Sequence, residues 1–250
     1  MKITVINGTQ KQGVTYQLKE IFLENFRKKA EITEYDLPKD CPAFCTGCLN
    51  CIFKGEHACK DSAYVQSIAA SLLEADLIVM TSPAYVFHTT GAMKAMLDHF
   101  VYLWMPHRPA PEMFLKRAVI ITQCLGAGAA STARDIGHSL SWWGISEIKV
   151  FKGQLMEDVV WDRLSEKRRM KLTKKIKCLS RKLLQIDYDK PVRTKLTVKI
   201  KFEACRMMQK ALFEKGKINF DGKYWAEQGW FGKARPWKMN DRSLSFSCKN

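Results

Sequence analysis

The sequence lacks any hydrophobic run long enough to cross a membrane. Its first ten residues, MKITVINGTQ, hold only a short apolar run, which is too short for the hydrophobic region of a secretory signal peptide. Internal repeats and low-complexity tracts are also absent. Since 46% of the residues are hydrophobic, the chain has enough apolar side chains to form a core. We therefore expect a globular protein without a membrane span, in the cytoplasm.

Two familiar nucleotide-binding motifs are missing as well. The loop after the β-branched run Lys2–Ile6 contains Gly8 and Gly13, but it matches neither GxGxxG nor the Lys-Ser/Thr ending of a P-loop. Pyrophosphate and nucleoside triphosphate are therefore poor fits. The loop still offers hydroxyl groups, amides and one cation at a strand-to-helix turn, where the positive helix end favours phosphate. It predicts a site for a single phosphate monoester, and the alternative is a polar loop without a ligand.

Acidic residues are scarce only in the second part of the chain. Residues 1–150 contain 15 Lys and Arg against 14 Asp and Glu, whereas residues 151–250 contain 26 against 11. Most of the net charge of +16 therefore lies in the second part. A basic surface attracts anionic partners. The distribution predicts a near-neutral domain followed by a basic extension.

Cysteine, by contrast, is plentiful: five of the nine cysteines lie between Cys41 and Cys59. Without a secretory signal, this number favours free thiols, metal ligation or redox chemistry over a disulfide framework. Cys45, Cys48 and Cys51 are separated by two-residue gaps, and Cys59 follows after a gap of seven. Such closely spaced thiolates hold a metal centre or serve a redox site, because a loop this short cannot pair them as long-range disulfides.

Apolar runs alternate with helical patterns along the first part of the chain. Five runs are predicted to be strands, at residues 2–6, 31–37, 76–81, 118–123 and 145–151. The runs at 76–81 and 118–123 show no alternation, as in parallel strands that are buried on both faces. Asp61 and Ser62 are expected to cap the helix that follows them. The alternation of strands and helices along the chain predicts a doubly wound α/β sheet. In such a sheet, ligands bind at the carboxyl ends of the strands.

The extension begins after an amphipathic helix over residues 164–186, whose outward face is basic. We predict a domain over residues 1–186 and a mostly helical, basic extension over residues 187–250. Residues 196–202 alternate like a strand, but we favour a helix, because several apolar residues then share one face: Leu196, Ile200, Met207, Met208 and Ala211. The density of large rings at Trp225, Trp230 and Trp237 suggests that the tail packs against another part of the structure.

Three of the loops that follow predicted strands suit a planar, phosphorylated ligand. The first of these loops follows the strand at residues 2–6. The second, after residues 76–81, offers a rigid turn, backbone amides and an aromatic ring. The third, after residues 118–123, has glycines that let a flat ligand approach the backbone. We predict that the three loops converge on one ligand. The candidate residues are Thr9, Gln10, Lys11 and Thr15 in the first loop, Pro83, Ala84, Tyr85 and Val86 in the second, and Gln123, Gly126 and Gly128 in the third.

The order and spacing of several segments resemble a known family. They are Gly8–Lys11, Cys45–Cys51, Ser82–Tyr85 and Gly91–Lys94, with Asp98. Together they resemble the flavodoxin-like NADPH-dependent FMN reductases, and more narrowly the iron-sulfur flavoprotein branch, over about residues 1–185. The resemblance implies a flavodoxin-like sheet of five parallel strands, FMN at the strand ends, and homodimers or homotetramers. It also implies electron transfer from reduced pyridine nucleotide, NAD(P)H, to an acceptor that the sequence does not identify.

Within this resemblance, the three loops receive separate roles. Residues 9–11 and Thr15 would hold the phosphate, with Lys11 where the family usually has arginine, so that the two-oxygen contact of a guanidinium is lost. Residues 83–86 would meet the ribityl chain and the ring edge, and residues 123–128 the isoalloxazine face. No catalytic acid or base is expected, because positioning alone delivers hydride to the flavin.

The cysteine loop keeps three interpretations open. A [4Fe-4S] cluster on Cys45, Cys48, Cys51 and Cys59 fits a compact Cys-x2-Cys-x2-Cys run with a fourth ligand elsewhere. Structural zinc more often uses two separated Cys-x2-Cys pairs, and the third interpretation is free thiols. A cluster would carry electrons away from FMN, whereas free thiols would line the loop beside the flavin or pack it at a subunit contact.

Two alternative functions concern the same chain. One is a flavodoxin-like electron carrier that does not oxidise nucleotides, although flavodoxins are typically smaller and acidic. The other is a flavin-linked protein whose basic extension binds nucleic acid or a membrane surface. The sequence has no recognised nucleic-acid-binding motif, so we expect no nucleic-acid partner. The favoured prediction is an FMN-dependent NAD(P)H oxidoreductase.

Overall fold

The structure is a computed structural model, and it describes residues 1–217 and 219–238. Five parallel strands form one sheet in the order β2-β1-β3-β4-β5. The strands are β1 (Lys2–Asn7), β2 (Glu31–Asp36), β3 (Leu77–Pro83), β4 (Arg117–Leu125) and β5 (Glu147–Leu155). The predicted doubly wound, five-stranded parallel sheet is thus confirmed. Pro83 is the last residue of β3, and β4 and β5 extend further towards their carboxyl ends than predicted.

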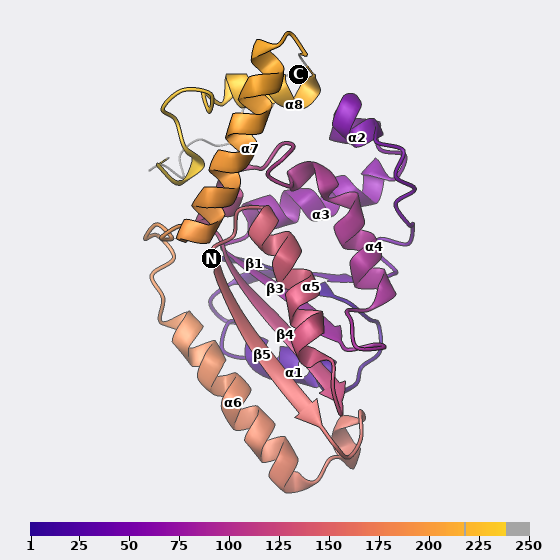
Figure 1. Ribbon diagram of the computed structural model, residues 1–250. Helices are drawn as coiled ribbons and strands as arrows, with labels where there is room; N and C mark the ends of the chain where they lie inside the picture. Colours follow the sequence, from indigo (N-terminus) through magenta and orange to yellow (C-terminus); the bar gives the residue numbers. More distant parts are fainter. Residues whose placement is uncertain (218, 239–250) are drawn as a thin grey trace.

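Helices cover both faces of this sheet (Figure 1). One face carries α3 (Ser62–Glu74), α4 (Gly91–His99) and α5 (Ala129–Trp142), and the other carries α1 (Val14–Leu23) and α6 (Glu166–Leu184). Two separate hydrophobic clusters fill the layers between sheet and helices. Short helical segments lie in the connections: α2 (Asn50–Phe53), η1 (Glu56–Ala58), η2 (Val101–Leu103), η3 (Pro111–Leu115) and η4 (Trp161–Arg163).

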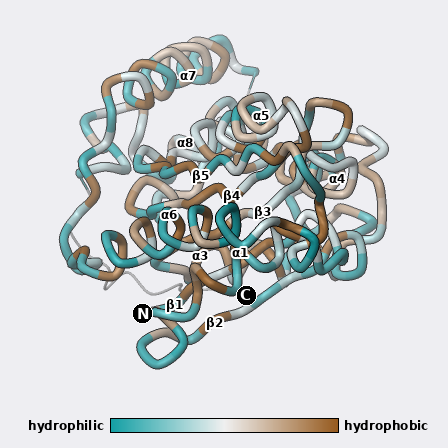
Figure 2. The backbone as a smooth tube through the Cα atoms, turned by 90° about the horizontal axis from the view of Figure 1, so that it is seen from below, coloured by the Kyte–Doolittle hydropathy of each residue, from teal (hydrophilic) through white to brown (hydrophobic). Residues whose placement is uncertain are grey.

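The central strands supply both clusters by simple alternation. On β3, Ile78 and Met80 pack under α3, α4 and α5, whereas Leu77 and Val79 pack under α1 and α6. β4 alternates in the same way, which explains why neither strand shows polar residues at every second position. Figure 2 shows hydrophobic segments along the strands in the middle of the molecule and hydrophilic segments at its periphery.

The helix α6 follows the predicted pattern. Leu172, Ile176 and Leu183 are buried against the sheet and α1. The basic residues of the predicted outward face lie at the surface or are half-buried: Lys167, Arg168, Arg169, Lys171, Lys174, Lys175, Arg181 and Lys182. No helix among the described residues is long and apolar enough to span a membrane.

The extension contains α7 (Leu196–Glu214), α8 (Phe220–Glu227) and η5 (Pro236–Lys238). The favoured helix over residues 196–211 is correct, but its apolar row at Leu196, Ile200 and Met207 is exposed. Its buried side is instead Val198, Phe202, Cys205 and Gln209. The end of the predicted extension, residues 239–250, lies outside the described part, and the predicted boundary at residue 186 stays a prediction.

The tryptophans of the tail pack as expected. Trp225 and Trp230 are fully buried, and Trp237 is partly buried in the same aromatic cluster. Phe202 forms its centre, with ring centroids 5.0 Å from Trp225 and 5.1 Å from Trp230. Phe114, which precedes β4, packs edge-on against Phe202 at 5.8 Å. The extension therefore packs on the segment that connects α4 to β4.

Candidate functional site

The first candidate loop is fixed against β3 at its beginning. The backbone N–H of Gly8 donates to the carbonyl oxygen of Thr81 at 2.7 Å, and the Thr90 hydroxyl donates to the carbonyl oxygen of Gly8 at 2.6 Å. A Cβ atom on Gly8 would lie 2.7 Å from that Thr81 oxygen, which is closer than real Cβ atoms approach. Glycine is therefore required here by close packing, and the loop starts beside the β3 end and the beginning of α4.

The rest of this loop leads to the N-terminus of α1. Thr9 accepts a hydrogen bond from the backbone N–H of Lys11 at 3.2 Å, and Gln10 and Lys11 are exposed. No side chain caps α1, and its first turn contains no acidic residue. The hydroxyl oxygen of Thr15 is buried without a hydrogen-bond partner among the described residues. A helix N-terminus beside an unsatisfied hydroxyl fits a single phosphate group.

The second loop is a tight turn with unusual backbone angles. Tyr85 and His88 exchange two backbone hydrogen bonds of 2.9 and 3.0 Å, while Val86 and Phe87 have φ values of 48° and 68°. Positive φ is rare for bulky residues and rarer for β-branched ones, and such strain concentrates at functional sites. Tyr85, Val86 and Phe87 are 48%, 91% and 62% exposed. The turn thus presents three apolar side chains to solvent.

An acidic residue of α5 holds this turn in place. One carboxylate oxygen of Asp135 lies 3.0 Å from Nδ1 of His88 and accepts a hydrogen bond from the backbone N–H of Thr89 at 3.1 Å. The Ser131 hydroxyl also donates to the carbonyl oxygen of Phe87. The sequence analysis did not identify Asp135, because an acidic residue on a helix surface gives no signal without the turn beside it.

The third loop contacts the second directly. The register of the sheet pairs Pro83 with Gln123, and the backbone N–H of Ala84 donates to the carbonyl oxygen of Gln123 at 2.8 Å. Gly128 has a φ of 108°, and a Cβ there would lie 2.9 Å from the Cα of Phe87. Glycine is required at this point for both reasons. The three predicted loops therefore lie at one edge of the sheet, as expected for the carboxyl ends of parallel strands.

Several buried polar atoms at the β4 end lack partners. They are the hydroxyl oxygens of Thr122 and Thr132 and the amide oxygen of Gln123, judged among the described residues. Buried polar groups in proteins are nearly always hydrogen-bonded, so each of these atoms is a candidate for contact with a polar group of a ligand. Thr122 and Thr132 were not among the predicted residues, although Thr122 directly precedes Gln123. By the alternation of β4, Thr122 points towards the α5 side of the sheet and Gln123 towards the α1 side, so only Gln123 lies on the same side as Thr15.

The cysteine loop follows β2 but extends away from these loops. Cys41 is buried, Cys45 and Cys48 are exposed, and Cys51 and Cys59 are half-buried. Figure 1 shows α2, which contains Cys51, near α8 and far from the carboxyl ends of β4 and β5. The expectation that the whole loop lies beside the flavin site is therefore wrong, because the chain turns away from the sheet edge after Leu37.

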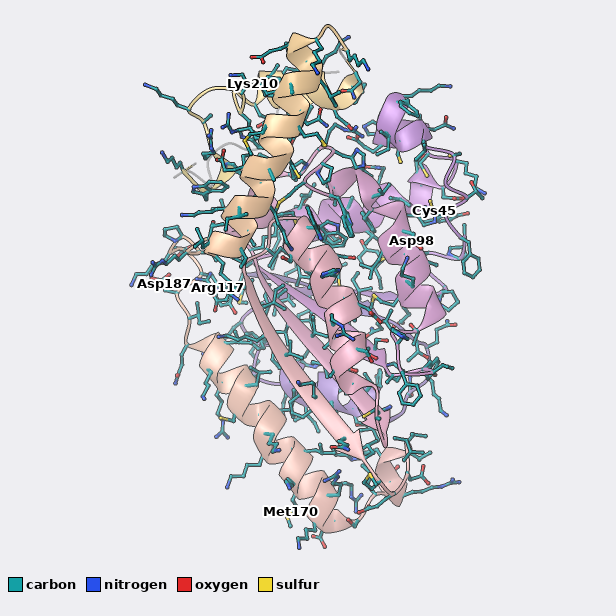
Figure 3. All side chains as sticks on the ribbon, viewed as in Figure 1. Cys45, Asp98, Arg117, Met170, Asp187 and Lys210 are labelled. Atoms are coloured by element: carbon teal, nitrogen blue, oxygen red, sulfur yellow. The ribbon has the colours of Figure 1, made fainter. Side chains whose placement is uncertain are left out.

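A groove connects the outer part of the cysteine loop to the second candidate loop. It has a volume of about 720 Å³ and lies between α4 and α5. His88 and Thr89 line it, and so do Cys45 and Gly47. Figure 3 shows Cys45 near Asp98, which also lines the groove. The groove is the structural link between the strand-end loops and the cysteines.

The spacing of the predicted ligand cysteines bears on their chemistry. Within residues 1–217 and 219–238, no three sulfur atoms of Cys45, Cys48, Cys51 and Cys59 lie within 4.8 Å of one another. Ligands of one tetrahedral zinc ion lie closer than this, whereas the cysteine sulfurs of a cubane cluster are more widely spaced. Burial, with the neighbouring thiolate of Cys59, raises the pKa of the Cys51 thiol. Metal binding at this loop would therefore displace protons.

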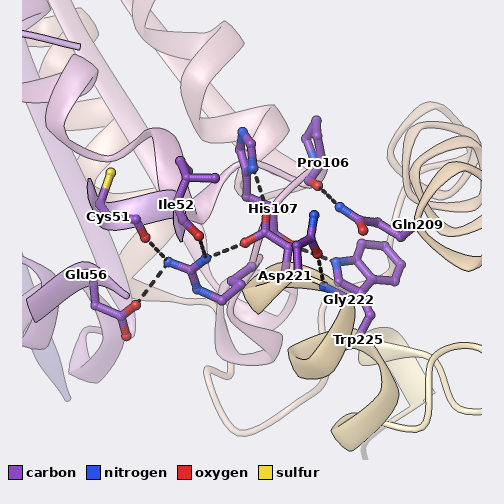
Figure 4. A network of polar contacts seen from close by, with 11 residues as sticks. Cys51, Ile52, Glu56, Pro106, His107, Gln209, Asp221, Gly222 and Trp225 are labelled. Atoms are coloured by element: carbon purple, nitrogen blue, oxygen red, sulfur yellow. Dashed lines mark hydrogen bonds and ion pairs between the residues drawn. The ribbon is translucent and has the colours of Figure 1, made fainter. Parts of the chain in front are cut away.

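A buried arginine joins the cysteine loop to the extension (Figure 4). Arg108 donates to the backbone carbonyl oxygens of Cys51 and Ile52, and it pairs with Glu56 at 3.1 Å and with Asp221 of α8. Asp221 also lies 2.8 Å from Nδ1 of His107. The neighbouring backbone is held as well, since the indole of Trp225, the amide of Gln209 and the hydroxyl of Tyr224 donate to the carbonyl oxygens of His107, Pro106 and Pro109.

The ring of Phe220 lies against the same loop. Its centroid is 4.8 Å from the guanidinium carbon of Arg108, and a Cβ on Gly55 would meet the ring at 3.1 Å. Gly55 also has a φ of 96°, so both the backbone conformation and the close contact with the ring of Phe220 favour glycine there. This arrangement could not be predicted from the sequence, because Arg108 and Asp221 are more than a hundred residues apart.

Comparisons with known proteins agree with this geometry. A family model described as NADPH-dependent FMN reductase matches residues 1–161. An iron-sulfur flavoprotein of Clostridioides difficile is 28% identical over 140 residues, which are 54% of this chain and 56% of that protein. An iron-sulfur flavoprotein of Archaeoglobus fulgidus is 33% identical over 104 residues, 39% of this chain and 48% of that protein. The matches thus span about half the length of these relatives.

A solved structure extends the similarity of the fold. The azoreductase from Bacillus anthracis str. Sterne superposes with a TM-score of 0.59 at 15% identity, covering 73% of this chain and 99% of that chain. At this identity the similarity concerns the fold alone.

Proposed function

The chain belongs to the NADPH-dependent FMN reductase family, and on this premise we propose that it oxidises NAD(P)H through FMN bound at the carboxyl ends of β1, β3 and β4. The observation that carries the proposal is the meeting of three loops at one sheet edge, with an unpartnered hydroxyl oxygen on Thr15 in the first turn of α1. A phosphate group at this helix end would satisfy the Thr15 hydroxyl.

In this proposal each loop has a separate task. The N-terminus of α1, with Thr9, Gln10, Lys11 and the Thr15 hydroxyl, binds the phosphate. Lys11 contributes a single exposed positive charge and cannot contact two phosphate oxygens as a guanidinium does. The backbone N–H groups and hydroxyls therefore make most of the hydrogen bonds to the phosphate. This arrangement selects the phosphorylated flavin over its unphosphorylated form.

The other two loops would orient the ring system. Gly126, whose Cβ would meet nothing within 4 Å, leaves the backbone open to a flat ligand, and Gly128 lets the second loop pack against the third. Pro83, Ala84, Tyr85 and Val86 border the ribityl chain and ring edge, and Asp135 keeps their turn fixed from α5. The Gln123 side chain supplies a buried amide to the ring's polar edge. When bound, FMN supplies hydride acceptance and one-electron chemistry.

We further propose that Cys45, Cys48, Cys51 and Cys59 can carry a [4Fe-4S] cluster. Two observations support this: the four thiols lie close enough to interact electrostatically, and the chain is similar to proteins named iron-sulfur flavoproteins. Four thiols on one loop are the donor set that such clusters use. An assembly of two or four copies would accord with the exposed apolar turn at Tyr85–Phe87, which a monomer leaves in solvent.

The test uses the full chain, loaded with FMN and kept anaerobic. Mixing with NADPH and, separately, NADH should bleach the flavin absorption with at least one of them, and oxygen should restore it. If neither nucleotide reduces the bound flavin while dithionite does, the chain is an electron carrier and the proposed oxidoreductase function is wrong. Iron and sulfide assays on the same preparation test the cluster independently, with four of each expected per loaded chain.

A further inference from the structure

Asp61 stands at a position where its side chain is expected to cap α3. The helix does begin at Ser62, with Asp61 at the N-cap, but the carboxylate accepts no hydrogen bond from the helix. Its Oδ2 atom is buried and lacks a hydrogen-bond partner among the described residues, and the residue is 8% exposed. A buried carboxylate without compensation is costly. The side chain is turned into the protein instead of serving the helix.

This carboxylate faces a buried histidine. Nε2 of His99, at the end of α4, lies 3.9 Å from Oδ2 of Asp61, and the histidine side chain is 1% exposed. The same nitrogen lies 3.1 Å from the carbonyl oxygen of Ala43, and Nδ1 has no partner among the described residues. Two ionisable side chains from different helices thus meet in a buried place with unsatisfied polar atoms on both.

The sulfur of Cys59 completes this group. One ligand atom each from Cys59, Asp61 and His99 lies within 4.8 Å of the others. In the described part of the chain this is the only group of three or more His, Cys, Asp and Glu ligand atoms with such spacing. Cys41 is buried beside Asp61 and Cys59, where it could provide a fourth ligand.

A thiolate, an imidazole and a carboxylate form a ligand set that zinc prefers. Zinc binds sulfur at about 2.3 Å and nitrogen or oxygen at about 2.0–2.2 Å, so tetrahedral ligand atoms lie roughly 3.3–3.8 Å apart. The 3.9 Å between Asp61 and His99 is close to that spacing before any ion is bound. The three residues therefore need only small movements to close on a metal.

We propose that Cys59, Asp61 and His99 bind a single divalent transition-metal ion, preferably zinc, at a site separate from the Cys45, Cys48 and Cys51 run. The site uses Cys59 when no cluster occupies that residue, so the two centres exclude each other within one chain. The ion would tie Cys59, at one end of the cysteine loop, to α3 and α4, and binding through Nε2 of His99 would replace the contact of that nitrogen with the carbonyl oxygen of Ala43. It is independent of the flavin proposal, because none of its ligands belongs to the strand-end loops.

The experiment uses the full chain, loaded with FMN and freed of iron and zinc by chelation. Titration with Co²⁺ should give one equivalent of bound metal, with a thiolate-to-cobalt charge-transfer band and d–d bands to the red of the flavin absorption, and Zn²⁺ should displace it. Asp61→Asn and His99→Gln should each weaken cobalt binding at least ten-fold while FMN affinity stays within two-fold. Cys45→Ser and Cys48→Ser should leave cobalt binding within two-fold.

Two results would overturn the proposal. One is a loss in Cys45→Ser as large as that in His99→Gln, which would put the ion on the cysteine run. The other is unchanged binding in both Asp61→Asn and His99→Gln. Because His99 is buried and its variant could fail to fold, zinc X-ray absorption on the unmodified chain gives a second test. One or two sulfur ligands with nitrogen or oxygen ligands support the site, whereas three or four sulfurs, or none, contradict it.

Discussion

The contact between Arg108 and Asp221 gives the sharpest stability prediction. Asp221→Ala removes the carboxylate that pairs with Arg108 and accepts from His107, and it leaves the arginine buried. We expect two separable effects: a loss of global stability, and a loosening of the cysteine loop that Arg108 holds through the carbonyl oxygens of Cys51 and Ile52. The flavin loops at the far edge of the sheet should be unaffected.

The magnitude follows from burial. The side chains of Arg108 and Asp221 are 5% and 3% exposed. Removing one partner of a buried ion pair costs about 3–5 kcal/mol, because the other charge stays buried without compensation. Glu56, at 3.1 Å and partly exposed, still pairs with Arg108 in the variant. We therefore expect the free energy of unfolding to fall by about 3 kcal/mol, at the lower end of that range.

The assay combines denaturant unfolding with alkylation of cysteines. In urea the midpoint should fall with an unchanged m-value. In the native state, Cys51 should be alkylated faster in Asp221→Ala than in the unmodified chain, while FMN affinity stays within two-fold. Glu214→Ala is the matched control, because it removes an exposed ion pair with Lys210 at 3.5 Å on the neighbouring helix α7 and should cost less than about 0.5 kcal/mol.

Two outcomes would refute this reasoning. If Asp221→Ala costs no more than Glu214→Ala, the buried pair does not stabilise the fold. If stability falls but the alkylation rate of Cys51 is unchanged, the extension stabilises the core without holding the cysteine loop.

The remaining predictions concern the flavin loops and the thiols. Gly8→Ala should weaken FMN binding at least ten-fold and cost about 1–3 kcal/mol, because its Cβ would lie 2.7 Å from a backbone oxygen. Gly91→Ala, whose Cβ meets nothing within 4 Å, should change neither the FMN affinity nor the free energy of unfolding. Equal effects of Gly8→Ala and Gly91→Ala would show that close packing at Gly8 is not the cause. In pulse alkylation followed by mass spectrometry, exposed Cys45 should react before Cys205, since burial raises the pKa of the Cys205 thiol from 9.0 to about 11. That raised pKa contributes stability that is complete below 9.0 and is lost as the pH rises towards about 11. The free energy of unfolding should therefore fall as the pH rises across this range, and the fall should be smaller in Cys205→Ala. An equally steep fall in the variant would show that the Cys205 thiol is not its cause.

The strands and their loops could be predicted because their signals are local. Parallel strands that are buried on both faces read as continuous apolar runs, as β3 and β4 do, and the residues directly after them must meet at one sheet edge. The face of α7 could not be predicted in the same way. Its sequence carries two apolar rows, and only the position of Phe114 and the tryptophans decides that Phe202 is buried and Ile200 exposed.

Contacts between distant segments explain the other differences. Asp61 reads as a helix cap in the sequence, and its inward direction depends on His99, which lies on another helix. Arg108 lies between Pro106 and Pro109, which suggests an irregular segment, but its partner Asp221 is on α8. Such pairings depend on how the helices pack, and one sequence contains no record of them.

The central claim is that the loop from Thr9 to Thr15 and the N-terminus of α1 hold the phosphate of FMN. The most direct measurement compares the affinities of FMN and riboflavin for the same flavin-free chain by fluorescence titration. Hydrogen bonds to a charged group contribute about 1.5–3 kcal/mol each, so two of them predict that riboflavin binds roughly 100-fold more weakly, or worse. Thr15→Val should reduce the ratio of the FMN affinity to the riboflavin affinity, because it removes a hydroxyl that binds the phosphate. Equal affinities for FMN and riboflavin in the unmodified chain would contradict the account.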